Sequence, residues 1–444
     1  MAEGGLGAHL GLWLVLPFVG MLLSVAILPL VADEWFSRHR SQAIVAAVFG
    51  VPVVVYILAV WGEAGLESVL TTAEDYVSFI LLLGALFTIT GGIYLTGNLL
   101  GTPRSNVTFL LVGAVLASFI GTTGAAMILV RPVLRANSER TRRAHVVVFL
   151  IFIVCNLGGL LTPLGDPPLF LGFLNGISFT WTFQLWPQWL LVNGLLLVIF
   201  YAVDRYHYRR EPRSALVEDA VDYVPLRILG KVNLLLLAGV VACVALSSPL
   251  AHLGEALHVP FLRDLLLVAL AVTSLRFGPR EPRRRNEFAW APILEVAILF
   301  AGIFASMLPV LEILRARGSA LGLSTPWQFF WATGSLSSVL DNAPSYLTMG
   351  SAAQGFLGLP EFAGLMSSTV DGAVGWSPAA FLAAVSCGAV MMGAITYIGN
   401  APNFMVRSIA EHHGVKMPHF FAYMGYSVVV LLPVFALVTL IFFV

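Results

Sequence analysis

Apolar runs of about 20 residues recur along this chain, and they constrain its fold more than any other feature. A helix needs roughly 20 mostly apolar residues to cross a lipid bilayer. Only 11% of the residues are charged, whereas a soluble domain carries about 25%. We therefore expect an all-α, multi-pass integral membrane protein with the lipid bilayer as its partner. Simple apolar runs lie near 9–31, 42–62, 76–97, 187–204, 231–250, 261–277 and 289–311.

Charge and cysteine content exclude several other classes of protein. The formal net charge is zero, so nothing in the bulk charge favours binding to nucleic acid. Cys155, Cys243 and Cys387 are dispersed within apolar runs, which predicts neither a disulfide framework nor a metal-ligand motif. No nucleophile and base are arranged as in an enzyme, so we expect no enzymatic activity and no cofactor beyond transported or coupling ions.

The distribution of arginine and lysine predicts which loops face the cytoplasm. Residues 1–41 begin without the basic stretch of a signal peptide and are expected to be a retained N-terminal membrane helix. The loop 32–41 carries Arg38 and Arg40 and is expected inside, whereas loop 63–75 carries only acids and is expected outside. Both termini are then external, and we expect the inner membrane of a bacterium. Further basic segments, expected inside, are 135–143, 205–230 and 278–288.

Two apolar regions cannot be simple crossings. Residues 105–134 enter and leave from the inside, and Gly121-Thr-Thr-Gly124 divides them into two pieces of about 15 residues, each too short to span. Residues 326–354 repeat this pattern from the other side, with Asp341 and Asn342 at the interruption. We predict two re-entrant helical hairpins.

Two more crossings are each predicted to be a broken helix. Residues 144–175 and 376–411 are apolar at both ends but contain glycine, proline and polar residues in the middle. Thr162 to Pro168 and Thr396 to Pro402 share the pattern T-x-x-G-[DN]-x-P, at a similar distance after each hairpin. This match predicts an internal duplication.

The order of these elements predicts two repeats of opposite orientation. Residues 42–204 read as span, span, hairpin, broken helix and span, and residues 261–444 repeat that order from the other side. Residues 205–260 are expected to form a basic cytoplasmic loop and a connecting helix. The whole chain is then predicted to have about ten spanning helices and two hairpins. Inverted repeats with discontinuous helices are typical of secondary transporters, whose sites lie near the middle of the bilayer.

The interruptions carry the residues that would begin new half-helices. Asp166, Asn342 and Asn400 each precede an early proline, and Thr122 or Thr123 could also cap a helix. Such starts offer backbone donors and a positive dipole end, and the preceding halves end in free carbonyls. One alternative is that the acids are merely good caps. An asparagine caps equally well, however, without the roughly 2.5 to 3.5 kcal/mol cost of a carboxylate at membrane depth.

These motifs resemble those of the ion transporter superfamily, which includes NhaD-type sodium/proton antiporters, arsenite permeases, and citrate and dicarboxylate carriers. The resemblance rests on N-x-G-G-x-x-T-P-x-G-D at 156–166, on Asp341-Asn342-x-Pro344, and on Thr396-x-x-Gly399-Asn400. It implies scaffold helices around a moving transport unit, a homodimer, and sodium or protons as coupling ions.

The charges of the site favour one substrate class. The dicarboxylate carriers that this chain resembles carry Ser-Asn-Thr signatures at both hairpin tips. This chain has Gly-Thr-Thr at the first tip and Asp-Asn-Ala-Pro at the second. Two carboxylates would repel a multivalent anion but bind sodium, and burial favours their protonated form. We favour sodium/proton antiport over cation-coupled citrate or dicarboxylate symport or an arsenite-type permease. The predicted ion- or substrate-binding residues are Asp166 and Asp341 (for sodium), Asn342, Asn156, Thr162, Gly165, Thr122, Thr123, Thr396, Gly399 and Asn400.

Overall fold

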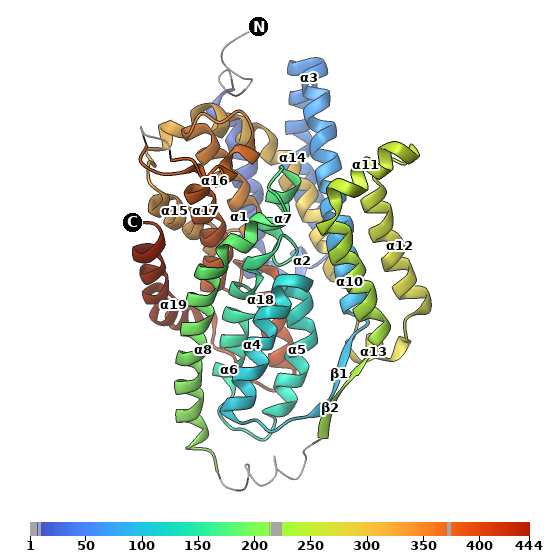
Figure 1. Cartoon of the computed structure of the whole chain (residues 1–444), viewed down its shortest axis with the longest axis vertical. Coiled ribbons are helices and arrows are strands. Elements are labelled where there is room, and N and C mark those ends of the chain that lie inside the picture. Colours follow the sequence, from blue (N-terminus) through green and yellow to red (C-terminus); the bar gives the residue numbers. More distant parts are fainter. Residues whose placement is uncertain (1–6, 8–9, 213, 215–223, 371–373) are drawn as a thin grey trace.

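The computed structural model describes residues 7, 10–212, 214, 224–370 and 374–444 and is built almost entirely of helices (Figure 1). In these ranges eight helices are long and apolar enough to cross a membrane. The number rises to nine if α10 (Lys231–Ala245) and α11 (Ser247–Leu257), which meet at 80°, count as one span. The chain is therefore an all-α polytopic membrane protein, as the sequence predicted.

The acidic loop expected at 63–75 is helical, which corrects the predicted boundaries of two spans. Helix α3 (His39–Thr90) runs through it, and the chain reverses at Gly62, whose φ is 54°. A Cβ on Gly65 would lie 2.5 Å from the carbonyl oxygen of Ile57, whereas eight residues of straight helix cover about 12 Å. One glycine with positive φ therefore replaces the expected loop.

A short two-stranded sheet was not predicted. Strands β1 (Tyr94–Asn98) and β2 (Val224–Leu229) pair antiparallel, with Tyr94 opposite Leu229. The span predicted at 76–97 therefore ends at Thr90, and the expected loop 205–230 contains a strand. Arg135 donates to the carbonyl oxygens of Leu95 and Gly97 at 2.5 and 3.2 Å, which satisfies part of the free edge of β1.

Two helical hairpins enter from opposite ends of the molecule. Helices α4 (Pro103–Ile120) and α5 (Thr122–Ala136) meet at Gly121, whose φ is 80°. Helices α15 (Pro326–Val339) and α16 (Asn342–Phe356) meet at Leu340 and Asp341. The first pair lies in the lower half of Figure 1 and the second pair in the upper half. Although α4 alone is long enough to span, the chain turns back at its end.

Two helices are interrupted in the same way. Extended backbone at Thr162 and Asp166 separates α6 and the 3-10 turn η3 from α7, and extended backbone at Thr396 and Asn400 separates α17 and η7 from α18. The order of hairpin followed by broken helix therefore occurs twice in the structure. The bounds are α6 Ala144–Ile153, η3 Leu157–Leu161, α7 Pro167–Leu174, α17 Pro378–Met392, η7 Gly393–Ile395 and α18 Ala401–His412.

The remaining helices surround this core. The long helix α14 packs along α3 and α1, and α12 packs on α3 and α10. Inside, α15 packs on α17, α16 on α7, and α18 on α5, so each hairpin contacts a broken helix. The other bounds are η2 Leu12–Val15, α1 Leu16–Val31, α2 Asp33–Phe36, η4 Trp181–Leu185, α8 Trp186–Tyr208, α12 Leu262–Phe277, α13 Arg280–Arg285, α14 Ala291–Arg317, η5 Gly318–Leu321, η6 Phe362–Met366 and α19 Phe420–Phe442.

Candidate functional site

The side chain of Asp166 lies at the point where the interrupted helices meet, and the residue is only 1% exposed. The Thr122 hydroxyl and the Asn400 amide donate to its Oδ1 at 3.0 and 3.1 Å. The Asn342 amide donates to its Oδ2 at 2.5 Å. Three segments far apart in the sequence therefore converge on one carboxylate.

Four half-helices begin at this network. Thr122 and Asn342 are the first residues of α5 and α16, and Asp166 and Asn400 precede α7 and α18. The side chains do not cap their helices as the sequence suggested. Gly121 and Asp341 hold the N-cap positions of α5 and α16, and no capping bond comes from the side chains of Asp166 or Asn400. These side chains bond to one another instead, near four positive dipole ends.

A chain of asparagine amides fixes the orientation of Asn400. Asn403 donates to the carbonyl oxygens of Gly393 and Thr396 at 2.9 and 3.0 Å, so its Oδ1 is left to accept from Asn156 at 2.8 Å. Asn156 then accepts from Asn400 at 3.3 Å. Because a carbonyl can only accept, this order fixes every amide and turns the N–H of Asn400 to the Asp166 carboxylate.

Sequence comparison of the two breaks missed Asn403. Its counterpart in the first break is Leu169, so the shared motif gave no reason to select it. Asn156 likewise has Val390 as its counterpart. The signal that could have found Asn403 is an amide one helical turn after Asn400 within an apolar segment.

The predicted threonines and glycines of the breaks hold the hairpin tips in place. Thr162 donates its hydroxyl to the carbonyl oxygen of Ser118, and Thr396 donates to that of Ser338 at 2.6 Å. The carbonyl oxygen of Gly165 accepts from the N–H of Thr122 at 2.9 Å. These residues position the network and do not donate to Asp166 themselves.

Each break also contains a pair of glycines in backbone contact. A Cβ on Gly165 would lie 2.0 Å from the carbonyl oxygen of Gly159, and one on Gly399 would lie 2.6 Å from that of Gly393. Both pairs are six residues apart. This repeated spacing was a sequence signal for a close approach, and it explains why Gly399 belongs to the site.

Asp341 and Thr123 lie beside the network without joining it. The Asp341 carboxylate accepts from the N–H of Ala343 at 3.1 Å and is the true cap of α16. Its residue is partly exposed, unlike Asp166. Thr123 is also partly exposed and is not among the donors to Asp166. Of the two predicted acids, only Asp166 is therefore surrounded by side chains from both hairpins.

The network contains acceptor oxygens that its hydrogen bonds do not fully satisfy. The partners of Asp166 are one hydroxyl and two amides, all neutral, and its Oδ2 accepts only the Asn342 bond among the described residues. Oδ1 of Asn342 is buried and has no hydrogen-bond partner in the described part of the chain. Exchanging the amide nitrogen and oxygen would place the oxygen against the carboxylate, where two acceptors would repel. The oxygen of Asn342 therefore remains the atom without a partner. A hard cation prefers such oxygens as ligands.

A second polar cluster lies near the base of the first hairpin and was not predicted. Asp204 on α8 is fully buried and accepts from Asn106, Arg140 and His145 at 2.9, 2.5 and 2.8 Å. These donors come from α4, from the loop after α5, and from α6. The cluster therefore ties the first hairpin and the first broken helix to α8.

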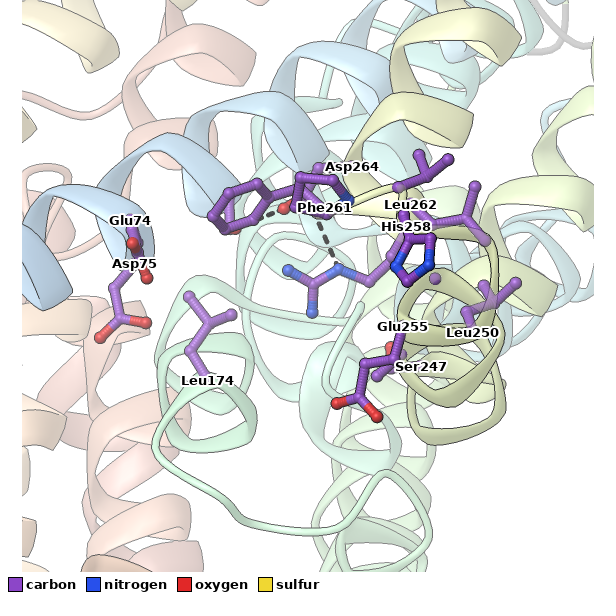
Figure 2. Close-up of a pocket in the computed structure, with 16 residues that line it drawn as sticks. Glu74, Asp75, Leu174, Ser247, Leu250, Glu255, His258, Phe261, Leu262 and Asp264 are labelled. Atoms are coloured by element: carbon purple, nitrogen blue, oxygen red, sulfur yellow. Dashed lines mark hydrogen bonds and ion pairs between the residues drawn. The ribbon is translucent and has the colours of Figure 1, made fainter.

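A cavity of about 680 Å³ opens elsewhere, between α3, α11 and α12 (Figure 2). Glu74, Asp75 and Glu255 line it, and Asp264 accepts there from Ser78 and Arg263 at 2.7 and 2.9 Å. No residue of its lining belongs to the Asp166 network. Leu174, at the end of α7, also lines it, so the cavity lies between the broken helix and the surrounding helices.

In comparison with known proteins, residues 7–443 match the model of a protein family described as "Putative citrate transport". The matched range includes both hairpins, both broken helices and every residue of the Asp166 network. Among the curated proteins, none is similar enough to this chain to count as a match.

Proposed function

Because the chain belongs to this citrate transport family, we propose that it is a secondary active transporter that exchanges sodium for protons at Asp166. The family match supports a secondary transporter and does not choose the ion. The choice rests on the network described above. Sodium and a proton would compete for one buried carboxylate, and the membrane gradient of either ion would drive the other.

The single observation that carries this proposal is the pairing of Asp166 with the orphan oxygen of Asn342. A buried carboxylate is costly unless a charge or hydrogen bonds compensate it. Neutral donors satisfy Oδ1 twice and Oδ2 once, whereas a carboxylate has about four acceptor positions. A proton or a cation can occupy the remaining position at Oδ2, and a cation would also satisfy Oδ1 of Asn342.

Access to this carboxylate must alternate between the two sides of the membrane. Asp166 is 1% exposed, so the structure is closed around it. The hairpin α4–α5 covers the site from one end and α15–α16 from the other, and each supplies one donor. Movement of one hairpin at a time would break one hydrogen bond to Asp166 and open one path to it.

Citrate symport is the second candidate, because the family description mentions citrate transport. In that case a sodium ion at Asp166 would accompany a citrate anion bound by the half-helix starts. The amides and the hydroxyl that would hold citrate now donate to Asp166. A multivalent anion would also approach an ionised carboxylate. The network is therefore better suited to a cation alone.

Purified protein in liposomes with an internal pH dye separates the two functions. Sodium, lithium, potassium, citrate and succinate are added outside in turn, and labelled citrate uptake is measured under a sodium gradient. Antiport predicts internal alkalinisation on sodium addition that is independent of citrate. Citrate uptake that requires sodium, with no proton movement on sodium alone, would instead establish the symporter.

A further inference from the structure

The basic end of α8 carries a shallow surface cavity of about 430 Å³. Figure 1 shows α8 at the edge of the molecule, with this end at the bottom. The residues that line the cavity all come from the last turns of α8 and the two positions after it. They are Tyr201, Ala202, Arg205, Tyr206, Arg209 and Arg210.

The two acids that the structure describes near this end are turned away from the cavity. Asp204 is buried on the opposite side of α8, where it forms an ion pair with Arg140 and accepts from His145. Glu211 accepts from the hydroxyl of Thr141 and from nearby backbone N–H groups at 2.7 to 3.0 Å. Both carboxylates are thus hydrogen-bonded within the protein. The outward face of this end therefore presents arginines.

The three cavity arginines are available to a ligand. Arg205 and Arg210 stack over Tyr201 and Tyr206, with Cζ 5.9 and 3.8 Å from the ring centroids. Stacking occupies the face of a guanidinium and leaves its N–H edge free for the oxygens of a phosphate. Across the ranges that the structure describes, neither these two nor Arg209 pairs with a carboxylate.

An apolar stripe runs along α8 from this cavity toward the opposite end of the helix. Trp186, Leu190 and Val198 are exposed by 59, 55 and 69% and belong to one i, i+4 row that winds slowly around the helix. Gly194, in the same row, has no atom within 4 Å of where its Cβ would be. Ala202 is also exposed and joins the stripe to the cavity. The stripe offers an acyl chain an apolar surface next to the arginines.

We propose that this cavity binds the headgroup of an anionic phospholipid, with one acyl chain along the α8 stripe. The chemistry recognised is a phosphate, and the stripe selects a lipid over free phosphate. An arginine-rich end faces the cytoplasm by the positive-inside rule, and that leaflet carries anionic lipids. Because α8 carries Asp204, a lipid bound here would contact the helix that anchors the first hairpin.

The test measures lipid binding to the purified full-length protein by native mass spectrometry. The probes are dioleoylphosphatidylglycerol, dioleoylphosphatidylcholine and inorganic phosphate. The test variant is Arg205→Gln/Arg209→Gln/Arg210→Gln. The matched control, Arg280→Gln/Arg284→Gln/Arg285→Gln on α13, removes the same charge from another exposed basic site. If the triple variant is unstable, the single variant Arg209→Glu takes its place.

We expect phosphatidylglycerol affinity to fall at least tenfold in the α8 variant and less than twofold in the α13 variant. Equal losses in both variants would overturn the proposal, because they would show attraction to net charge only. Equal affinity for phosphatidylcholine, or binding of inorganic phosphate as tight as that of the lipid, would also overturn it. So would efficient disulfide cross-linking of Ala202→Cys between copies, which would show a second chain on this face.

Discussion

Asn342 donates its side-chain amide to Oδ2 of Asp166 over 2.5 Å, which joins the tip of the second hairpin to the break in the first broken helix. The two residues are 176 positions apart in the chain. The same amide group carries a buried oxygen without a partner in the described part of the chain. One side chain therefore both holds the carboxylate and offers a second ligand to a cation.

Replacing Asn342 with alanine should weaken sodium binding while leaving the fold intact. The variant loses Oδ1, the proposed second ligand of sodium, and also one donor to Asp166, and a hydrogen bond to a charged group contributes about 1.5 to 3 kcal/mol. We expect the sodium concentration for half-maximal proton flux to rise at least tenfold in liposomes. Ser345→Ala is the control, because its hydroxyl donates only to a backbone carbonyl. Similar sodium dependence in the two variants would contradict this role.

The glycine pairs of the breaks give a prediction about stability. A methyl group at Gly165 would meet the carbonyl oxygen of Gly159 at 2.0 Å, so Gly165→Ala should lower the thermal unfolding midpoint in detergent. Overpacking of this kind costs about 1 to 3 kcal/mol or more. Gly425→Ala is the control, since nothing lies within 4 Å of that position. An unchanged midpoint for Gly165→Ala would show that the backbones do not approach as closely.

The buried Asp204 cluster should contribute more stability than a surface ion pair. Asp204→Asn leaves the Arg140 charge buried without its partner, which costs about 3 to 5 kcal/mol. The comparison is Glu281→Gln, which removes an exposed pair with Arg285 and should cost at most about 1 kcal/mol. Denaturant titration of the two purified variants measures the difference. Equal losses would mean that the cluster does not anchor the first hairpin.

Glu211 gives a pH dependence outside the spanning segments. Burial opposes its ionisation, but the hydroxyl and N–H of Thr141 and the N–H of Arg142 outweigh this and hold its pKa below the ordinary value of 4.5. A lowered pKa stabilises the fold above pH 4.5, and this stabilisation is lost as the pH falls through the lowered value. Wild type should therefore lose more stability between pH 5 and roughly pH 3 than Glu211→Gln. Parallel pH profiles of the unfolding midpoint would contradict this.

The membrane class and the positions of the breaks could be predicted because each depends on local sequence. Apolar length predicts membrane-spanning helices, but Gly121 was also needed to predict that α4, which is long enough to span, belongs to a hairpin. Gly121 and the T-x-x-G-[DN]-x-P strings interrupt apolar runs, and the structure has interruptions at the same places. Asp166 stood out because a carboxylate at that depth is costly.

The partners of each side chain could not be predicted because they depend on packing between distant segments. Both Asp166 and Asp341 precede helix starts, yet only the first faces the opposite hairpin, whereas the second caps its own helix. Asn403 joins the network through the amide of Asn156, in the break after α6, a contact that no local motif records. The reversal at Gly62 and the pairing of β1 with β2 were missed for the same reason.

The most direct test of the account compares Asp166→Asn with Asp341→Asn in liposomes of equal protein content. Both changes remove one carboxylate charge, and asparagine caps a helix about as well as aspartate. Sodium-dependent proton flux is measured for each variant with an internal pH dye. We expect flux to be lost in well-folded Asp166→Asn and largely kept in Asp341→Asn. Flux near the wild-type rate in Asp166→Asn would show that sodium and protons do not exchange at this carboxylate.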